Sequence, residues 1–487
     1  MLDRSEYDLF IDGRFTPASG EETITTVDPA TEEPLAEVAA ATAADVDRAV
    51  AAGRDTFAAW RDVPGEERYR HLLDVARVIR NHADELARLE CLDNGKPLSQ
   101  ARGDVLSTAR YFEYYAGIAD KVHGESIPLD RDHVDYTIRE PLGTVGVIVP
   151  WNFPLNILGR SVSVALATGN TAVVKPAEQT PLSALRFAEL VAAETELPDG
   201  AVNVVPGYGD PAGAALSGHP DVDGVSFTGS VVTGIEVAKQ AVDNVTPVHL
   251  ELGGKSPNVV FPDADLEDAV ANAITAIFTT GAGQVCSAGS RLLVHEDVHD
   301  EVLSRLVERT AELSIGPGVD DPDVGPLNSR AQFEKVTRYI DVGREEVGDP
   351  VLGGEALDRP GYFVEPTIFD GVDTRTRIAQ EEIFGPVLTV TTFADEAEAI
   401  ELANDVDYGL VAGVFTGDVG RAHRFAREVQ AGQVFVNEWF PGGEETPFGG
   451  YKQSGFGREK GLAAVDEFTQ TKNVCANVSA EGSTLGR

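Results

Sequence analysis

The chain has 487 residues, of which 42% are hydrophobic, so it is long enough for two or three cores and is not globally disordered. It carries 80 acidic and 39 basic residues, a formal net charge of −41, and this excess of acid argues against nucleic acid or an anionic membrane as a partner. The acid is spread along the chain rather than gathered in a tail, which favours a strongly hydrated surface suited to high salt over a specific cationic partner.

The N-terminal stretch MLDRSEYDLF is charged and acidic, so no secretory signal is visible. No uninterrupted apolar run approaches the roughly 18 residues of a membrane span. The three cysteines, Cys91, Cys286 and Cys475, are too few and too scattered for a disulfide framework or a zinc site, and we expect no bound metal. A reducing cytoplasm fits this cysteine usage best, with Cys91 and Cys475 interpreted as structural.

The first half of the chain alternates helix and strand signals. Residues 42–60 carry apolar side chains at helical spacing behind a threonine cap, and residues 181–195 indicate a helix with proline near its first turn. Short apolar runs rich in β-branched residues predict buried strands at 145–150, 171–175, 201–205 and 224–227. We therefore expect a doubly wound α/β sheet with parallel strands, whose ligand lies at the carboxyl ends of those strands.

The second half repeats the alternation. Residues 265–278 predict a helix, and further strands are expected at 290–295, 387–393, 411–415 and 433–436. A second α/β domain follows from this pattern. Gly253 and Gly254 are the best candidates for a hinge between the two domains.

Two segments in the first half suit a nucleotide. FTGSVVTG ends a strand with Gly229, Ser230 and Gly234 before a helical stretch, where backbone N–H groups can meet a phosphate, although the spacing is not G-x-G-x-x-G. In VVKPAEQTP, Lys175 and Glu178 follow a strand, where a lysine can bind ribose and a carboxylate can hold a ribose hydroxyl and repel a 2′-phosphate. Taken singly, the first segment also fits an ordinary strand-to-helix turn and the second a surface ion pair.

Three residues suggest catalysis. Asn152 in VPWNFPLNI lies in an apolar setting where an amide can donate to an oxyanion. Glu251 in HLELGGKSP ends an apolar strand, where burial would raise its pKa and suit a general base. Cys286 stands among small residues in TTGAGQVCSAGSR, and it is either a nucleophile or a buried filler. Read alone, Asn152 also fits a turn and Glu251 a solvated strand end.

Seven segments taken together favour the functional interpretation of these residues over the structural one. PWNFP, VVKPAEQTP, FTGS, ELGGKSP, GQVCSAGSR, EEIFGPV and TPFGGYKQSGFGRE resemble the NAD(P)-dependent aldehyde dehydrogenase superfamily, in its order and spacing, over about residues 8–477. The resemblance implies oxidation of an aldehyde to the carboxylic acid with NAD(P)+ through a cysteine thiohemiacetal and thioester. A CoA-acylating relative usually lacks the ELGGK glutamate, and a non-enzyme of this fold would most simply have lost the cysteine or the asparagine, so both alternatives are disfavoured.

The resemblance also implies roles for individual residues. Cys286 matches the nucleophile, Glu251 the general base, Asn152 an oxyanion donor beside the Cys286 backbone N–H, and Glu459 a proton relay to the base. The residues implied at the cofactor are Trp151, Lys175, Glu178, Gly229, Ser230, Gly234, Glu382 and Phe384, with NAD favoured and NADP left open. Those implied at the substrate are Phe153, Ile157, Val285, Ser287, Trp439 and Phe448. This lining favours a small aliphatic aldehyde, with a carboxylated semialdehyde or betaine aldehyde as the alternative and Arg160 as a candidate anchor.

The sequence departs from the family at two positions. The asparagine that often precedes the nucleophile by five residues is Gly281 here, which we expect to loosen the loop or alter cofactor packing while sparing the thiol. The family's common lysine after PWNFP falls on Ser161, beside Arg160, so the relay through Glu459 lacks its usual partner.

The implied fold has three parts: a Rossmann-like cofactor domain, an α/β catalytic domain and a small β excursion for oligomerisation. The expected boundaries are 1–120 and 142–253 for the NAD(P)-binding domain, 254–466 for the catalytic domain, and 121–141 with 467–487 for the oligomerisation segments. The alternating pattern of 467–478 fits an added strand, which needs a partner because an exposed edge invites pairing. Family members are dimers or dimer pairs, so a homodimer or homotetramer is implied.

Overall fold

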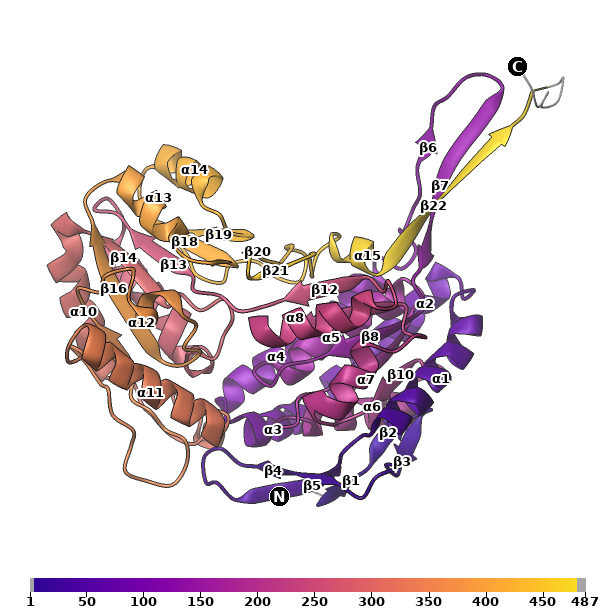
Figure 1. Cartoon of the computed structure of the whole chain (residues 1–487), viewed down its shortest axis with the longest axis horizontal. Helices are drawn as coiled ribbons and strands as arrows, with labels where there is room; N and C mark the ends of the chain where they lie inside the picture. The colour runs from indigo at the N-terminus through magenta and orange to yellow at the C-terminus, as the bar shows by residue number, and fades with distance from the viewer. Residues whose placement is uncertain (1–3, 480–487) are drawn as a thin grey trace.

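Two large sheets and a protruding β arm organise the chain (Figure 1). The computed structural model describes residues 4–479. Residues 1–3 of the expected cofactor domain and residues 480–487 of the expected oligomerisation segment lie outside this range. Within it, no helix is both long and apolar enough to cross a bilayer.

The first sheet has eight strands and carries most of the sequence motifs. Its five central strands are parallel, and an antiparallel strand or hairpin is added at each edge. In spatial order the strands are β21 (Gly455–Phe456), β12 (Val248–Glu251), β11 (Gly224–Thr228), β8 (Thr144–Ile148), β9 (Thr171–Lys175), β10 (Val202–Val204), β2 (Leu9–Ile11) and β3 (Arg14–Thr16). The predicted parallel, doubly wound arrangement is confirmed.

Helices cover both faces of this sheet because its strands are apolar on both sides. In β9, Val173 packs into the core on one face, whereas Ala172 and Val174 pack into the core on the other. The first face is covered by α1 (Ala43–Trp60), α7 (Ala214–Ser217) and α8 (Val231–Val242), and the second by α2 (Gly65–Asn81), α3 (Ala83–Asn94), α4 (Leu98–Ala116), α5 (Pro154–Ala167) and α6 (Leu182–Glu194). Thr42 caps α1 through a capping box with Asp45, as its sequence predicts.

The order of the strands creates a crevice. From β8 the chain moves through β9 to β10 on one side, and then returns to place β11 and β12 on the other. The connections leave β8 and β11 in opposite directions, so their carboxyl ends flank a topological switch point. This is where a doubly wound sheet binds its ligand.

The second sheet has six parallel strands. In spatial order they are β15 (Thr367–Phe369), β16 (Val387–Phe393), β14 (Arg291–His295), β13 (Pro257–Val260), β18 (Val411–Phe415) and β19 (Gln433–Val436). One face packs against α9 (Leu266–Ile274) and α10 (His299–Ala311). The other face packs against α13 (Glu396–Asn404) and α14 (Val419–Glu428). A further core lies beside β15 and β16, where they meet α11 (Arg330–Glu346) and α12 (Arg377–Gln380). The predicted helix at 265–278 ends at Ile274 and continues as a π-helical turn, Thr275–Thr279.

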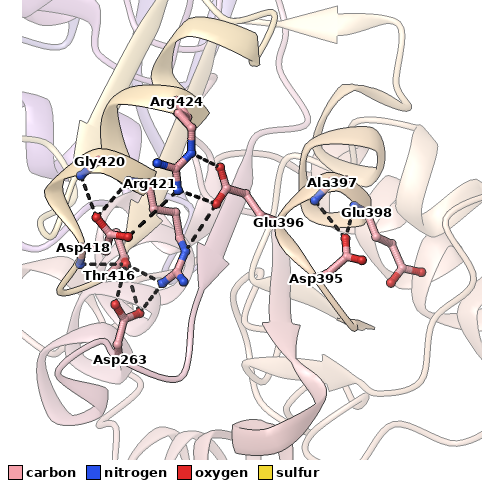
Figure 2. A network of polar contacts seen from close by, with 10 residues as sticks. All are labelled: Asp263, Asp395, Glu396, Ala397, Glu398, Thr416, Asp418, Gly420, Arg421 and Arg424. Atoms are coloured by element: carbon pink, nitrogen blue, oxygen red, sulfur yellow. Dashed lines mark hydrogen bonds and ion pairs between the residues drawn. The ribbon is translucent and has the colours of Figure 1, made fainter.

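Charged side chains hold the two helices α13 and α14 together at the surface (Figure 2). Glu396 on α13 accepts two hydrogen bonds from the Arg424 guanidinium on α14, at 2.7 and 2.8 Å. Arg421 reaches back to Asp263 at 2.6 Å, in the loop after β13. Asp395 caps α13 by accepting from the backbone N–H groups of residues 397 and 398.

Each large sheet forms one body with the helices that cover it, the first sheet the first body and the second sheet the second body. The arm stands away from both (Figure 1). It consists of β6 (Ser126–Ile127), β7 (His133–Pro141) and β22 (Thr469–Asn477), with β22 antiparallel to β7 along its whole length. Both segments were expected to form such an excursion, and their pairing joins residues far apart in the sequence. Smaller pairings are β1 (Glu6–Tyr7), β5 (Pro34–Ala39) and β4 (Thr23–Val27) in one sheet, and β17 (Tyr408–Gly409) with β20 (Tyr451–Lys452) in another.

Candidate active site

Motif residues gather at the carboxyl edge of the first sheet. Asn152 follows β8, Lys175 ends β9, Ser230 follows β11 and Glu251 ends β12. Because these strands are parallel neighbours, their carboxyl ends meet along one line. The fold therefore brings together side chains spread over about a hundred residues of sequence.

A pair of glycines lets the second sheet deliver its loop to this edge. Gly253 and Gly254 link β12 in the first sheet to β13 in the second. A Cβ on Gly254 would lie 2.3 Å from the carbonyl oxygen of Cys286, and one on Gly253 would lie 2.6 Å from a carboxylate oxygen of Glu382. Only glycine permits this approach. Motion about this link stays a prediction.

Asn152 is tied to the loop that carries Cys286. Its Nδ2 donates to the carbonyl oxygen of Gln284 at 2.9 Å, two residues before the thiol. Since an amide nitrogen has two N–H groups, one bond fixes the side chain and a second donor remains. Behind it, Asn94 donates to the carbonyl of Trp151 at 2.7 Å, and the side chain of Gln284 accepts from the Asn328 backbone N–H at 2.8 Å. The bonds from Asn94 and Asn328 thus hold the two segments that meet at this contact.

Hydrogen bonds hold Gly281 in a tight turn, and its effect on loop mobility and on cofactor packing stays a prediction. Its φ is +55°, a left-handed conformation that glycine adopts without steric cost. The side chain of Gln100 accepts from its N–H at 3.0 Å and donates to the carbonyl of Thr279 at 2.5 Å. The side chain of Gln284 also donates to the carbonyl of Gly281 at 3.0 Å. These bonds hold the turn that precedes Cys286.

Burial sets the protonation of the two reacting groups. The Cys286 side chain is half-buried, and desolvation raises the pKa of its thiol to about 12. Glu251 is buried, and desolvation raises the pKa of its carboxyl to about 7, although its hydrogen bond with His249 opposes the rise. The thiol is therefore protonated near neutrality and needs a base, while Glu251 titrates in the range where it can serve as one.

Glu459 lies in a buried cluster behind Glu251. It forms an ion pair with Arg160, and its Oε1 lies 3.3 Å from the hydroxyl of Ser161 and 3.4 Å from that of Ser226. The Arg160 side chain is also buried and lies over the ring of Phe448. Its charge is already matched by Glu459, which removes the reason to treat it as a free substrate anchor.

A groove next to this edge has the shape and the groups for a dinucleotide. About 1470 Å³ of open space follows the ends of β8, β9 and β11, lined by Lys175, Glu178, Ser230 and other residues. Burial lowers the pKa of Lys175 to about 8, and its Nζ donates to the carbonyls of Pro176 and Gly207. Ser230 caps α8, so the N–H groups of the first turn of that helix open near the groove. These residues would fit ribose and phosphate.

The groove continues into a smaller cavity of about 590 Å³ that reaches Cys286. Glu382 and Phe384 line it together with Trp151, whose ring meets that of Phe384 edge-on at 5.3 Å. Glu382 accepts from the Gly254 N–H at 2.9 Å, and burial raises the pKa of its carboxyl. A flat ring placed here would lie between the aromatic side chains and the thiol.

Two predicted cofactor positions differ in their surroundings. Gly229 lines the groove, and its N–H donates to the carbonyl of Glu251 at 3.0 Å. Gly234 lies in the first turn of α8, where a Cβ would be 2.5 Å from Leu252. The contact seen at Gly234 is therefore close packing of the helix on the sheet, and the residue does not line the groove.

The predicted substrate residues divide into two groups. Trp439 and Phe448 form an aromatic cluster with Phe435, and Cys286 packs against it. Phe153 is half-buried with the ammonium group of Lys96 4.3 Å from its ring centre, and Ser287 is buried next to the thiol in sequence. Ile157 and Val285 instead belong to the cores of the first and second bodies.

Sequence reasoning missed three polar residues at the site. Gln332 donates to the carbonyl of Phe384 at 2.6 Å and so supports its left-handed backbone, at φ +63°. Lys335 lines the same cavity and counters the effect of burial on the pKa of Glu382. Both come from α11, which shows no motif. His249 contacts Glu251 at 3.3 Å, and its position two residues earlier on one strand was a signal for a shared face.

The geometry agrees with comparison to known proteins. The family model described as the aldehyde dehydrogenase family matches residues 15–474. The chain belongs to the aldehyde dehydrogenase family. It is accordingly an oxidoreductase with the predicted Rossmann-like and catalytic α/β folds.

This aldehyde dehydrogenase is similar to several named relatives. A hydroxyisobutyraldehyde dehydrogenase of Mycolicibacterium austroafricanum is 46% identical over 473 residues, 96% of this chain and 94% of the relative. A betaine aldehyde dehydrogenase of Bacillus subtilis is 44% identical over 478 residues, 96% and 97% of the two chains. The structure of an aldehyde dehydrogenase from Bacillus cereus in complex with NAD+ has a TM-score of 0.95 and 44% identity, covering 97% of both chains.

Proposed function

We propose that this aldehyde dehydrogenase oxidises a small aliphatic aldehyde to its carboxylic acid with NAD+, using Cys286 as nucleophile. The convergence of Asn152, Glu251 and Cys286 at one end of a dinucleotide-sized groove supports the proposal. The NAD+ complex of the Bacillus cereus structure supports the choice of cofactor.

The reaction begins with proton transfer within the site. Glu251 accepts the thiol proton of Cys286, because the carboxylate is ionised above about pH 7 while the thiol is not. The thiolate adds to the aldehyde carbon, and the resulting oxyanion accepts from the remaining Asn152 N–H and from the Cys286 backbone N–H. When bound, the nicotinamide supplies the hydride acceptor that turns this adduct into a thioester.

Hydrolysis completes the cycle. Glu251, once free of the first proton, removes a proton from water as the water oxygen attacks the thioester carbon. The tetrahedral adduct collapses, the Cys286 sulfur leaves and takes back from Glu251 the proton that came from water, and the carboxylic acid is released. The carboxyl of Glu251 thus takes up a proton twice in each turnover.

Glu178 supports NAD over NADP as the cofactor. It lines the groove near Lys175, with 3.9 Å between the ammonium nitrogen and a carboxylate oxygen. A carboxylate here can accept from ribose hydroxyls and would repel a 2′-phosphate. Lys175, Ser230, Glu382, Phe384 and Trp151 complete the proposed cofactor site.

The substrate pocket favours an uncharged aldehyde. Trp439 and Phe448 present aromatic surface beside Cys286, and the nearby Arg160 is paired with Glu459. A carboxylated semialdehyde would need a free cation, whereas Arg160 is paired with Glu459. Lys96, beside Phe153, is paired with Glu90 and Asp104. The hydroxyisobutyraldehyde relative supports a small aliphatic substrate, and the betaine aldehyde relative keeps a second candidate, because aromatic faces also attract a quaternary ammonium group.

We also propose a homo-oligomer that works in high salt and in the cytoplasm, divided into domains at the Gly253–Gly254 link. Exposed apolar side chains on β7 support assembly through the arm: Val134, Tyr136 and Ile138 share one face of the strand. The net charge of −41 supports a salt-adapted surface, and three unpaired cysteines suit a reducing compartment.

Absorbance of reduced nicotinamide tests the function directly. The purified enzyme in molar salt would be mixed with NAD or NADP and with propionaldehyde, hydroxyisobutyraldehyde, betaine aldehyde or succinic semialdehyde. We expect the highest kcat/KM with NAD and an uncharged aliphatic aldehyde, and no turnover by Cys286→Ala. Preference for the semialdehyde would reject the proposed substrate class, and turnover by Cys286→Ala would reject the nucleophile.

A further inference from the structure

His249 stands between two buried carboxylates. Its Nε2 lies 3.3 Å from an oxygen of Glu251, and its Nδ1 lies 3.7 Å from an oxygen of Glu459. The imidazole is 4% exposed, so solvent does not separate it from either group. The second distance exceeds hydrogen-bond length by a few tenths of an ångström, as is common before substrate binds.

The charged groups around the ring favour a proton there. Glu251 lies on the same strand, Glu459 faces the ring from the C-terminal segment, and Glu467 on α15 (Ala464–Glu467) also raises the pKa of His249. Burial opposes this rise. Arg160 is the nearby cation, and it is paired with Glu459. An imidazolium would therefore have carboxylates on more than one side.

A cavity offers the ring a way to solvent on the side away from the thiol. About 280 Å³ of space is lined by His249, Ser226 and Glu467 and extends to the exposed Pro247. Its other lining residues include Gly224 and Val248, at the amino ends of β11 and β12. The aldehyde and cofactor grooves lie at the opposite, carboxyl ends.

With Ser161 in place of the family's lysine, the relay lacks a proton carrier, and His249 can serve as one. The hydroxyl of Ser161 contacts Glu459 but carries no titratable proton near neutrality, and the relay lysine of the family is absent at this position. Glu251 must nevertheless lose the proton from the thiol before it can accept one from water. The imidazole touches Glu251, and its two ring nitrogens let it accept a proton on one side and release one on the other.

We propose that His249 is a positioning residue that relays protons from Glu251 to Glu459 and to the cavity at the amino ends of the strands. This inference rests on the proposed function of Glu251. Nε2 accepts the proton of the Glu251 carboxyl, and Nδ1 releases one to Glu459 or to solvent in the cavity. One proton enters and one leaves, no electrons are transferred, and exchange with the cavity restores the first tautomer between turnovers.

His249→Gln tests the relay. Hydride transfer in the first cycle needs Glu251 only once, before hydrolysis, so the variant should give a burst of reduced cofactor equal to one per active site. A steady rate roughly 10- to 100-fold below wild type should follow. Added imidazole should restore part of that rate through the cavity, while wild type should not respond. His299→Gln is the matched control, because His299 pairs with Asp370 on the surface of the second body and should leave both phases unchanged.

Three results would overturn the relay. These are a wild-type steady rate in His249→Gln, a steady rate that imidazole leaves unchanged, and equal losses of burst and steady rate, which indicate a structural role.

Should the variant fail to fold, the steady rate of the wild-type enzyme in mixtures of H₂O and D₂O replaces it. A curved dependence on the deuterium fraction supports several moving protons, and a straight line rejects the relay. Absence of any turnover by the wild-type enzyme would instead reject the proposed function itself.

Discussion

One amide N–H of Asn152 donates to the carbonyl of Gln284, and the other remains available to an oxyanion. Asn152→Ala should therefore lower kcat by about 100- to 1000-fold, the usual effect of losing one such donor. Steady-state rates with a saturating aldehyde would measure this loss. Asn156→Ala, one turn along α5, is a control that should retain activity, because its amide donates a long hydrogen bond to the Asp104 carbonyl, at 3.5 Å, rather than to the Cys286 loop. A decrease below tenfold in Asn152→Ala would contradict the role.

The raised pKa of Glu251 predicts how turnover depends on pH. The base is the ionised carboxylate, and desolvation raises its pKa to about 7, so kcat should rise with pH to a plateau with its midpoint near 7. The pKa of the Cys286 thiol is about 12. If the thiol lost its proton to solvent alone, the rate would keep rising toward that value. A profile measured from about pH 5.5 to 9 distinguishes a plateau from a continued rise.

The sequence predicts those residues whose side-chain type and neighbouring motif already indicate a chemical role. Cys286, Glu251 and Asn152 stand in recognisable segments, and the structure brings all three to one edge. Gln332 and Lys335 could not be found this way, because an ordinary helix delivers them from another part of the chain. The sequence leaves Arg160 as a candidate anchor because its partner, Glu459, lies almost 300 positions away.

The N-cap of α13 gives a prediction for a single element (Figure 2). Asp395 accepts from two backbone N–H groups, at 2.9 and 3.0 Å, so Asp395→Ala should lower the stability of the second body by about 1 kcal/mol. The midpoint of urea unfolding would measure it. Glu401→Ala, at an exposed position of the same helix, removes the same kind of charge without removing a cap. Equal midpoints for the two variants would refute the capping contribution.

Regular elements were predictable where side chains repeat with a clear period. The buried strands β8, β9 and β11 and the helix α1 were expected within a few residues of their observed bounds. β21 was not expected, because it is two residues long and lies in a glycine-rich segment with Gly455 at φ +112°. It nevertheless pairs with β12, directly beside Glu251, so a short irregular segment completes the edge of the first sheet.

The net charge of −41 predicts the response of the whole molecule to salt. The distance over which charges repel falls from about 10 Å at 0.1 M salt to about 3 Å at 1 M. The Tm should therefore rise on the order of 10 °C between these concentrations, followed by circular dichroism. Sucrose at matched osmolality is the control for effects that do not depend on charge. A flat or falling Tm would contradict a salt-adapted surface.

The arm predicts how the chains assemble. Tyr136 on β7 is 41% exposed and shares its face with Val134 and Ile138. Tyr136→Glu should shift the proposed dimer or tetramer toward the monomer in sedimentation velocity, because a charge would be buried in the proposed interface. Tyr69→Glu is the matched control, since Tyr69 is also 41% exposed but lies on α2 outside the arm. An unchanged assembly in Tyr136→Glu would exclude this face as the interface.

The strand β22 that closes the arm is the direct continuation of the segment that carries Glu459 (Figure 1). Only the short helix α15 lies between them, and it holds Glu467 next to His249. The arm is therefore joined to the buried carboxylates by one continuous stretch of chain, just as β7 joins it to β8 of the first sheet. If the proposed assembly holds β22 in place, its loss should slow the release of the acid before it weakens cofactor binding, because the cofactor groove is lined by residues of other elements.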